Sequence, residues 1–261
     1  MIEILKRSVS ESGRALLALR SDKVYEGEWK GPQFKAKADM LINEALTESL
    51  RSQAPEIPVV SEEDPASLAR IGREPYFIID PIDGTASFVH GFAGFVTQAA
   101  YVEDGVVEAS AICAPVTGEL FHAVRGGGAY RNSERLRIRD PSRWETIIDN
   151  YPEPRGIAAE AFAGLGFHKY VESGSIALKI CRVADNTADI FFKDVPVQQW
   201  DIAAPDLVLS ESGGTLVPLS GKPADYTVHE EYQGIVAANS DGHAKRLIAW
   251  YSKLIRQRGG A

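Results

Sequence analysis

Near Asp140 to Trp144 the expected secondary structure changes in kind, and this change limits the fold more than any other feature of the sequence. Before it, after two amphipathic helices, apolar segments of strand length follow one another directly. After it, such segments alternate with segments of helix length. Consecutive strands and alternating strands and helices build different layers, so the sequence predicts an α+β half joined to an α/β half. We place the seam at 139–145 and divide the chain into halves of residues 1–140 and 141–261.

Apolar periodicity and turn residues predict the individual elements. In the first half we expect helices at 4–19, 39–52 and near Ser67, and strands at 57–60, 77–79, 95–102, 106–113 and 119–124. The polar stretch 24–37, which contains two glycines and a proline, is expected to form a loop. In the second half we expect strands at 147–148, 167–171, 188–192, 215–217 and 235–238, and helices at 157–164, 175–184, 202–212 and 243–256.

The acidic balance of the chain limits its partners. The 261 residues carry a formal net charge of −8 and the pI is about 5.2, whereas a nucleic-acid-binding protein usually presents a basic face. No apolar run approaches the length that crosses a bilayer, and the N-terminus is amphipathic, unlike a secretion signal. The two cysteines, Cys113 and Cys181, give no disulfide framework. We therefore expect a cytoplasmic protein that binds neither nucleic acid nor membrane.

The segment 80–85, Asp-Pro-Ile-Asp-Gly-Thr, follows the apolar run 76–79, which is typical of a buried strand. Two carboxylates three positions apart on a turn stiffened by proline can converge on one point, and Mg²⁺ needs oxygen ligands in such a rigid arrangement. The carbonyl of Ile82 offers a third oxygen. The amides of Gly84 and Thr85 can open a short helix, whose start attracts phosphate. The alternative is an ordinary strand-to-helix turn, because proline and Asp-Gly are common in turns.

Two further acidic segments accompany this turn. Residues 61–64, Ser-Glu-Glu-Asp, precede it, and Trp200-Asp201 opens an apolar helix that ends at a Gly-Gly pair. In this order the three motifs resemble those of the inositol monophosphatase superfamily, which comprises magnesium-dependent, lithium-sensitive phosphatases of small molecules. The resemblance extends from about Asp39 to Gly214 and continues more weakly through 234–239. It implies a layered α-β-α-β-α sandwich of the sugar-phosphatase type, with the site between the halves, and a homodimer.

Hydrolysis of a phosphate monoester requires charge neutralisation, a hydroxide at neutral pH and a stabilised leaving oxygen, and two metal ions can supply all three. The resemblance assigns Glu62, Asp80 and the Ile82 carbonyl to a first Mg²⁺. It assigns Asp83 and Asp201 to a second ion that Asp80 bridges. A third, loosely held ion near Glu62 is common in the superfamily, and Mn²⁺ is expected to substitute for Mg²⁺.

Simpler alternatives exist for some of these positions. Glu62 and Glu63 could form a solvated acidic loop. Because adjacent residues of an extended segment point apart, only one of them is expected to bind metal, and the motif selects Glu62. Asp201 could serve only as the N-cap of its helix, with Pro205 in the first turn, where a missing amide costs little.

A second group, Asp39 and Thr85, is implied by the resemblance to orient the attacking water and help deprotonate it. These two residues and Glu62 form the expected catalytic set. The chain departs from the superfamily pattern at Ala36, where members usually carry threonine, which puts the local hydrogen bonding of Asp39 in question. The structural alternative for Asp39 is a cap of the helix at 39–52.

Different segments of the sequence indicate different substrates. Residues 88–92 and 123–129 look like those of inositol monophosphatases, whereas 61–64, 114–116 and 178–179 look like those of bacterial 3'(2'),5'-bisphosphate nucleotidases, which act on phosphoadenosine phosphate. We favour inositol monophosphate, with the nucleotidase as the alternative. The expected substrate-binding residues are Asp83, Gly84, Thr85, Gly174, Ser175, Lys193, Asp194 and Asp201. Lys179 and Lys193 could bind a second phosphate or could simply be exposed to solvent.

A protein that keeps this fold for a regulatory role, without catalysis, is the alternative from another class. The five acidic positions of the motifs are all present, which favours an enzyme. The sequence thus predicts a metal-dependent phosphoric monoester hydrolase whose partners are a small phosphorylated substrate and a second copy of itself.

Overall fold

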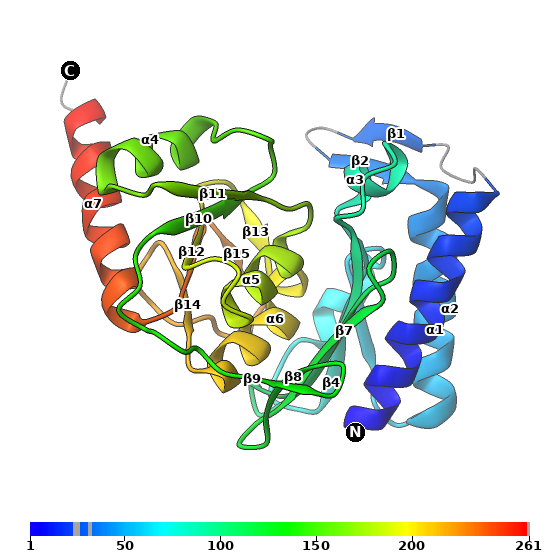
Figure 1. The fold of residues 1–261 in the computed structure, drawn as a ribbon. Coiled ribbons are helices and arrows are strands. Elements are labelled where there is room, and N and C mark those ends of the chain that lie inside the picture. Colours follow the sequence, from blue (N-terminus) through cyan, green and yellow to red (C-terminus); the bar gives the residue numbers. More distant parts are fainter. Residues whose placement is uncertain (23–26, 31–32, 260–261) are drawn as a thin grey trace.

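The computed structural model describes residues 1–22, 27–30 and 33–259, and residues 27–30 and 33–36 by their backbone alone. The described elements stack in five layers, helices alternating with sheets (Figure 1). This arrangement confirms the predicted α-β-α-β-α sandwich. None of the described helices is both long and apolar enough to cross a membrane.

The first sheet has seven strands in the order β3-β4-β5-β6-β7-β8-β9, and only the pair β3 and β4 is parallel. The strands are β3 (Val59–Ser61), β4 (Tyr76–Asp83), β5 (Val96–Glu103), β6 (Val106–Ala114), β7 (Glu119–Val124), β8 (Gly128–Arg131) and β9 (Glu134–Leu136). Its outer face is covered by the helices α1 (Ile2–Ser21) and α2 (Lys37–Gln53). The short helices η1 (Pro65–Arg70) and α3 (Thr85–Val89) lie on either side of β4 in the sequence.

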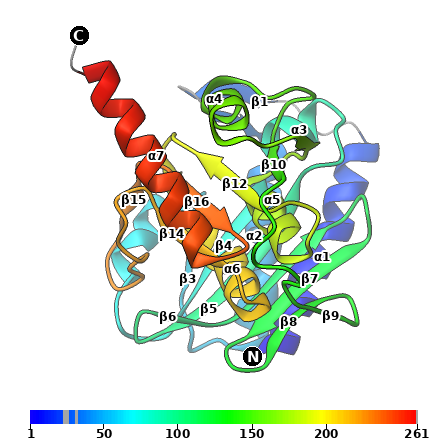
Figure 2. The same cartoon turned by 60° about the vertical axis from the view of Figure 1, so that its left-hand side comes forward.

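The second sheet has five strands in the order β11-β10-β12-β16-β14. They are β10 (Thr146–Asp149), β11 (Lys169–Glu172), β12 (Ile190–Lys193), β14 (Thr215–Pro218) and β16 (Ile235–Ala238). The helices α5 (Ile176–Ala184) and α6 (Gln199–Ser212) lie between the two sheets, and α4 (Gly156–Leu165) and α7 (Asp241–Gly259) cover the outer face. Figure 2 shows α7 crossing in front of β14 and β16. Two small pairs complete the fold, β1 (Gly27–Lys30) with β2 (Gln33–Ala36), and β13 (Val197–Gln198) with β15 (Glu231–Tyr232).

Alternation along the strands explains how one sheet serves two cores. On β5, Val96 and Ala100 belong to the apolar cluster that includes α5 and α6, whereas Ala99 between them belongs to the cluster under α1 and α2. The strand β4 is buried along its whole length, from Tyr76 to Asp83, and its first four residues form the continuous apolar run that is typical of a strand covered on both faces. The central cluster draws residues from both predicted halves. The division at 140/141 itself stays a prediction.

Three expectations about elements were wrong. The stretch 24–37, expected to be a loop, contains β1 and β2, although residues 23–26 and 31–32 lie outside the described part. The strands β8 and β9 follow the glycine turn where none were expected. The helix expected at 202–212 begins at Gln199, so that Pro205 lies in its second turn.

Candidate active site between the two sheets

The strand β4 carries the central motif farther than expected. Rather than ending at residue 79, it continues through Asp83, and its register against β5 shifts between Asp80 and Asp83. Asp80 and Asp83 are both buried, with 1% and 6% of their surface exposed. Gly84 then turns the chain with φ +92°, and a Cβ there would lie 3.0 Å from the Gly94 carbonyl oxygen. Glycine is required at this turn, because L residues rarely adopt that conformation and no space is left for a side chain.

Asp80 lies at the centre of a group of carboxylates. Burial raises the pKa of Asp80 well above its usual value, and the charges of Glu62, Asp83, Asp201 and Asp39 raise it further. Its Oδ1 accepts a hydrogen bond from the Ile82 amide at 3.0 Å. The chain therefore brings together carboxylates from α2, the loop after β3, β4 and α6. Such a group of like charges is unfavourable unless a cation or proton joins it.

Asp83 joins the two halves through the start of α5. Its Oδ1 accepts the Ile176 amide at 3.1 Å and its Oδ2 accepts the Ala177 amide at 2.6 Å. Burial raises the pKa of Asp83, but these amides and the nearby Lys179 oppose the shift. Sequence analysis missed these amides. The Gly-Ser before an apolar helix was the available signal, since Ser175 caps α5 by accepting the Leu178 amide at 3.0 Å.

Gly174 and Gly94 make this junction possible. The Ser175 amide donates to the Gly94 carbonyl at 2.6 Å. A Cβ on Gly174 would lie 2.0 Å from the Gly94 carbonyl oxygen, and one on Gly94 would lie 2.5 Å from the Gly174 nitrogen. Because the two backbones meet directly, neither position tolerates a side chain.

Thr85 and Asp39 form the expected pair. Thr85 Oγ1 lies 3.1 Å from Asp39 Oδ1 and 3.1 Å from the Ile82 carbonyl oxygen. A threonine hydroxyl has one hydrogen, so it donates to one of these oxygens at a time. Asp39 is buried in the first turn of α2, which starts at Lys37. The side chain of Ala36, where the chain departs from the superfamily, lies outside the described part.

The loop after β3 holds two adjacent glutamates. Ser61 Oγ donates to Asn43 Oδ1 at 2.6 Å and accepts the Glu63 amide at 3.2 Å. The charge of Glu62 is among those that raise the pKa of Asp80. The side of the loop that carries Glu62 therefore faces the buried carboxylates.

Asp201 enters the group from α6. It is the third residue of that helix, and its Oδ2 accepts the Gln198 amide at 2.7 Å. The alternative that Asp201 is the N-cap is wrong, since Gln198 occupies that position. Pro205 has no N–H for the Asp201 carbonyl, four residues back, and Gln98 Nε2 lies 3.5 Å from that oxygen instead.

The two lysines differ in their surroundings, and binding of a second phosphate by them stays a prediction. Lys179, with 1% of its surface exposed, contacts Asn150 Oδ1 and lies 2.9 Å from the Gly174 carbonyl, so the expectation of solvent exposure is wrong. Burial lowers the pKa of Lys179 to about 7. Lys193 is partly exposed and pairs with the two oxygens of Asp149 at 2.9 and 3.2 Å. Asp194 follows β12 and is partly exposed.

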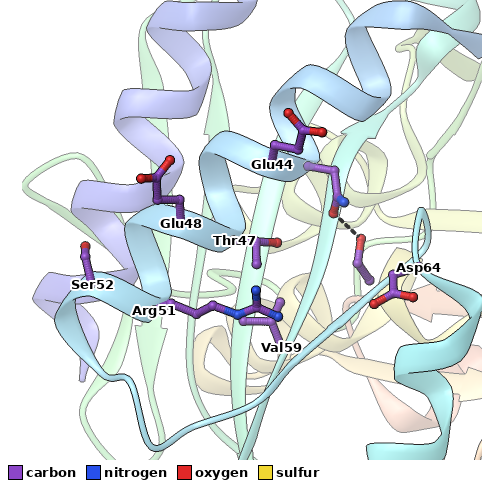
Figure 3. Close-up of a pocket in the computed structure, with 9 residues that line it drawn as sticks. Glu44, Thr47, Glu48, Arg51, Ser52, Val59 and Asp64 are labelled. Carbon is purple, nitrogen blue, oxygen red and sulfur yellow. Dashed lines mark hydrogen bonds between the residues drawn. The ribbon is translucent and has the colours of Figure 1, made fainter.

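Two hollows lie near these groups. One, of about 600 Å³, follows the junction of the halves and is lined by Ser87, Gly94, Asn150, Tyr151 and Gly174, among others. The other, of about 550 Å³, lies between α2 and β3, where Glu44, Thr47, Glu48 and Arg51 stand along the helix opposite Val59 and Asp64 (Figure 3). Neither is lined by the buried carboxylates themselves.

The donor set fits a hard divalent cation in kind, because it consists of carboxylate and carbonyl oxygens. Among the described side chains, no three of the His, Cys, Asp or Glu type converge closely enough to form a finished metal site. Asp80, Asp83 and Asp201 each accept a hydrogen bond from a backbone amide. A cation that joined the group would replace mutual repulsion by attraction.

Comparison with known proteins identifies the family. The model of the inositol monophosphatase family matches residues 1–256. The Nus factor SuhB of Vibrio cholerae is 27% identical over 271 residues, which cover 100% of this chain and 97% of that protein. The 3'(2'),5'-bisphosphate nucleotidase CysQ of Shigella flexneri is 30% identical over 200 residues, 75% of this chain and 80% of that one. The structure of an IMPase from Thermotoga maritima superposes with a TM-score of 0.80 at 25% identity, covering 98% and 96% of the two chains. The chain belongs to the inositol monophosphatase family.

Proposed function

We propose that this protein is a Mg²⁺-dependent phosphomonoesterase that hydrolyses a small phosphorylated metabolite, inositol monophosphate first among them. The observation that carries the proposal is Asp80, buried among four other carboxylates that raise its pKa. A chain gains nothing in stability from such a group, and perturbed acids of this kind gather at functional sites. The family to which the chain belongs makes phosphate ester hydrolysis the expected use.

Five positions would hold the metal ions. Glu62, Asp80 and the Ile82 carbonyl would take one Mg²⁺, and Asp80, Asp83 and Asp201 a second. A third ion near Glu62, and Mn²⁺ in place of Mg²⁺, belong to the same proposal. Bound there, the ions would lower the pKa of a water molecule and neutralise the phosphoryl and leaving oxygens.

Thr85 and Asp39 would handle the proton of the attacking water. When the Thr85 hydroxyl donates to Asp39 Oδ1, 3.1 Å away, its own lone pairs remain to accept a hydrogen bond from water. Asp39 then holds the hydroxyl in that orientation and can take up the proton through it. The amides of Gly84 and Thr85 would bind phosphate oxygens beside this pair.

Residues of the second half would bind the rest of the substrate. Gly174 and Ser175 lie at the junction, where the backbone contact with Gly94 fixes their position. Lys193, the last residue of β12, and Asp194, which follows it, would bind substrate hydroxyls together with Asp83 and Asp201.

A 3'(2'),5'-bisphosphate nucleotidase is the second candidate. It is favoured by the likeness to CysQ and by the partly exposed ammonium of Lys193. The likeness to SuhB, named a Nus factor, covers the whole chain and keeps a non-catalytic, regulatory role as a third candidate. A homodimer is proposed in each case.

Phosphate release from p-nitrophenyl phosphate, with and without Mg²⁺, tests the enzymatic proposal. Metal-dependent release that Li⁺ inhibits supports it, and the absence of release from this ester and from natural monoesters would favour the regulatory role. Rates on inositol monophosphate and phosphoadenosine phosphate then separate the two enzymes. A preference above tenfold, about 1.4 kcal/mol of transition-state binding, decides between them. Fructose bisphosphate and histidinol phosphate complete the panel.

A further inference from the structure

Residues 225–230, which we call the strap, connect β14 to β15 and pack against the first half of the chain. The Tyr76 hydroxyl, at the start of β4, donates to the Tyr226 carbonyl at 2.6 Å. At the turn between β5 and β6, a Cβ on Gly105 would lie 2.3 Å from Thr227 Cγ2. The strap is therefore in direct contact with the strand that carries Asp80.

Buried polar side chains of the second half hold the strap. Tyr232 Oη accepts the Asp225 amide at 3.0 Å, and Gln199 makes the larger set of bonds. Gln199, fully buried, donates from Nε2 to the carbonyls of Asp225 at 2.5 Å and Val228 at 2.8 Å. Its Oε1 accepts the Glu230 amide at 3.3 Å. A primary amide has two N–H donors, so both are used here, and no other neutral side chain of this length offers the same set. A hydrocarbon at this position would leave three backbone groups of the strap without these bonds.

Gln199 is also the first residue of α6, two positions before Asp201. The next residue, Trp200, stacks on His229 of the strap with ring centroids 6.1 Å apart and planes 8° apart. Just before the helix, β13 pairs with β15, which follows the strap. Gln199 and Trp200 in the first turn of α6 thus contact the strap, and β13 just before the helix pairs with the strand that follows the strap.

The helix itself holds this turn less firmly than usual. Pro205 provides no amide for the Asp201 carbonyl, so one helical hydrogen bond of the first turn is absent. The contact from Gln98 that takes its place is long, 3.5 Å. The position of Asp201 consequently depends on its capping box with Gln198 and on what the first turn touches outside the helix.

We propose that Gln199 is a positioning residue that, through the strap, sets Asp201 against Asp80 and thereby sets the affinity of the site for divalent cations. The inference rests on the proposed function, which makes both carboxylates metal ligands. Groups that orient metal ligands typically change metal affinity 10- to 100-fold when they are replaced, because a ligand displaced by a fraction of an ångström no longer completes the site.

Mn²⁺ binding to the full chain, measured by titration calorimetry and by the electron paramagnetic resonance of free Mn²⁺, tests the inference. We expect Gln199→Met to raise the dissociation constant by roughly 10- to 100-fold. The Mg²⁺ concentration for half-maximal activity should rise similarly, while kcat at saturating Mg²⁺ stays within about twofold. Gln233→Met is the matched control, because Gln233 is exposed, its side-chain amide donates to Glu231 at 2.9 Å, and it lies just beyond the strap. It should bind Mn²⁺ like the unaltered chain.

Unchanged Mn²⁺ affinity in a folded Gln199→Met protein would overturn the inference, since a merely structural role lowers the melting temperature and leaves the affinity alone. If that variant does not fold, Tyr76→Phe keeps the buried ring and removes only the bond to the strap. It should weaken Mn²⁺ binding at least threefold, and unchanged binding would overturn the inference as well. An unaltered chain that binds no Mn²⁺, or whose binding Asp201→Asn does not affect, would refute the proposed function together with this inference.

Discussion

Asp83→Asn separates the structural from the proposed chemical role of this carboxylate. Asp83 accepts two backbone amides at the start of α5, at 3.1 and 2.6 Å, and hydrogen bonds to a charged group contribute about 1.5–3 kcal/mol each. Asparagine can accept only one of them with its single oxygen and turns an N–H₂ group toward the other amide. Burial of the charge, which raises the pKa of Asp83, offsets part of this loss because the neutral side chain no longer has to be desolvated as an ion. We expect a net loss of about 1–2 kcal/mol.

Asp80→Asn is the matched control, because the balance at Asp80 is the opposite. Asp80 Oδ1 accepts the Ile82 amide at 3.0 Å, and four carboxylates repel the charge of Asp80. With a chelator present, the melting temperature of Asp83→Asn should therefore lie roughly 2–8 °C below that of the unaltered protein. The melting temperature of Asp80→Asn should equal or exceed that of the unaltered protein. Both should lose at least a hundredfold in Mg²⁺-dependent phosphate release. Differential scanning calorimetry with EDTA measures the first effect. A metal-free Asp83→Asn protein that melts above the unaltered one would refute the role of Asp83 in joining the halves.

Three other predictions follow from the site and its surroundings. Thr85→Val should lower kcat by about 10²–10⁴-fold, whereas Thr85→Ser keeps the hydroxyl and most of the activity; equal rates for the two would exclude the proposed proton path. Gly174→Ala should destabilise the protein by more than about 2 kcal/mol in urea unfolding, because its Cβ would lie 2.0 Å from the Gly94 carbonyl oxygen, whereas Gly72→Ala, with no atom within 4 Å, should be nearly neutral. Burial raises the pKa of Asp206 to about 7, so the folded state binds this proton more tightly than the unfolded state, and stability falls as pH rises from about 4 to 7. Asp206→Asn should flatten that part of the stability profile, and an unchanged slope would contradict the assignment.

Much of the fold could be predicted because local pattern and burial agree. The strands β4, β5 and β6 consist mostly of apolar residues, and Asp104-Gly105 marks the turn between the last two. The start of α6 could not be placed, because Pro205 indicated a first turn, whereas the capping box of Gln198 with Asp201 and the contacts of Gln199 with the strap accompany an earlier start. The pairs β1–β2 and β8–β9 lie in polar or glycine-rich segments, where periodicity gives no signal.

The acidic motifs could be found in the sequence, and their meeting around Asp80 agrees with the pattern. What the sequence could not give is how each carboxylate is held. The bond between Asp83 and Ala177 joins residues 94 positions apart, and the burial of Lys179 depends on Asn150 and Gly174 of two other segments. The packing of the two halves sets such contacts. The sequence around Ser175 indicates a helix start there, but it does not indicate which carboxylate that start binds.

The most direct test of the central claim is an anomalous difference map from crystals of this protein grown with Mn²⁺. The account predicts at least two peaks, roughly 4 Å apart, with the Asp80 carboxylate between them and with oxygens of Glu62, Ile82, Asp83 and Asp201 about 2.0–2.3 Å from one or the other. A map at full Mn²⁺ occupancy elsewhere, with no peak among these five residues, would contradict it.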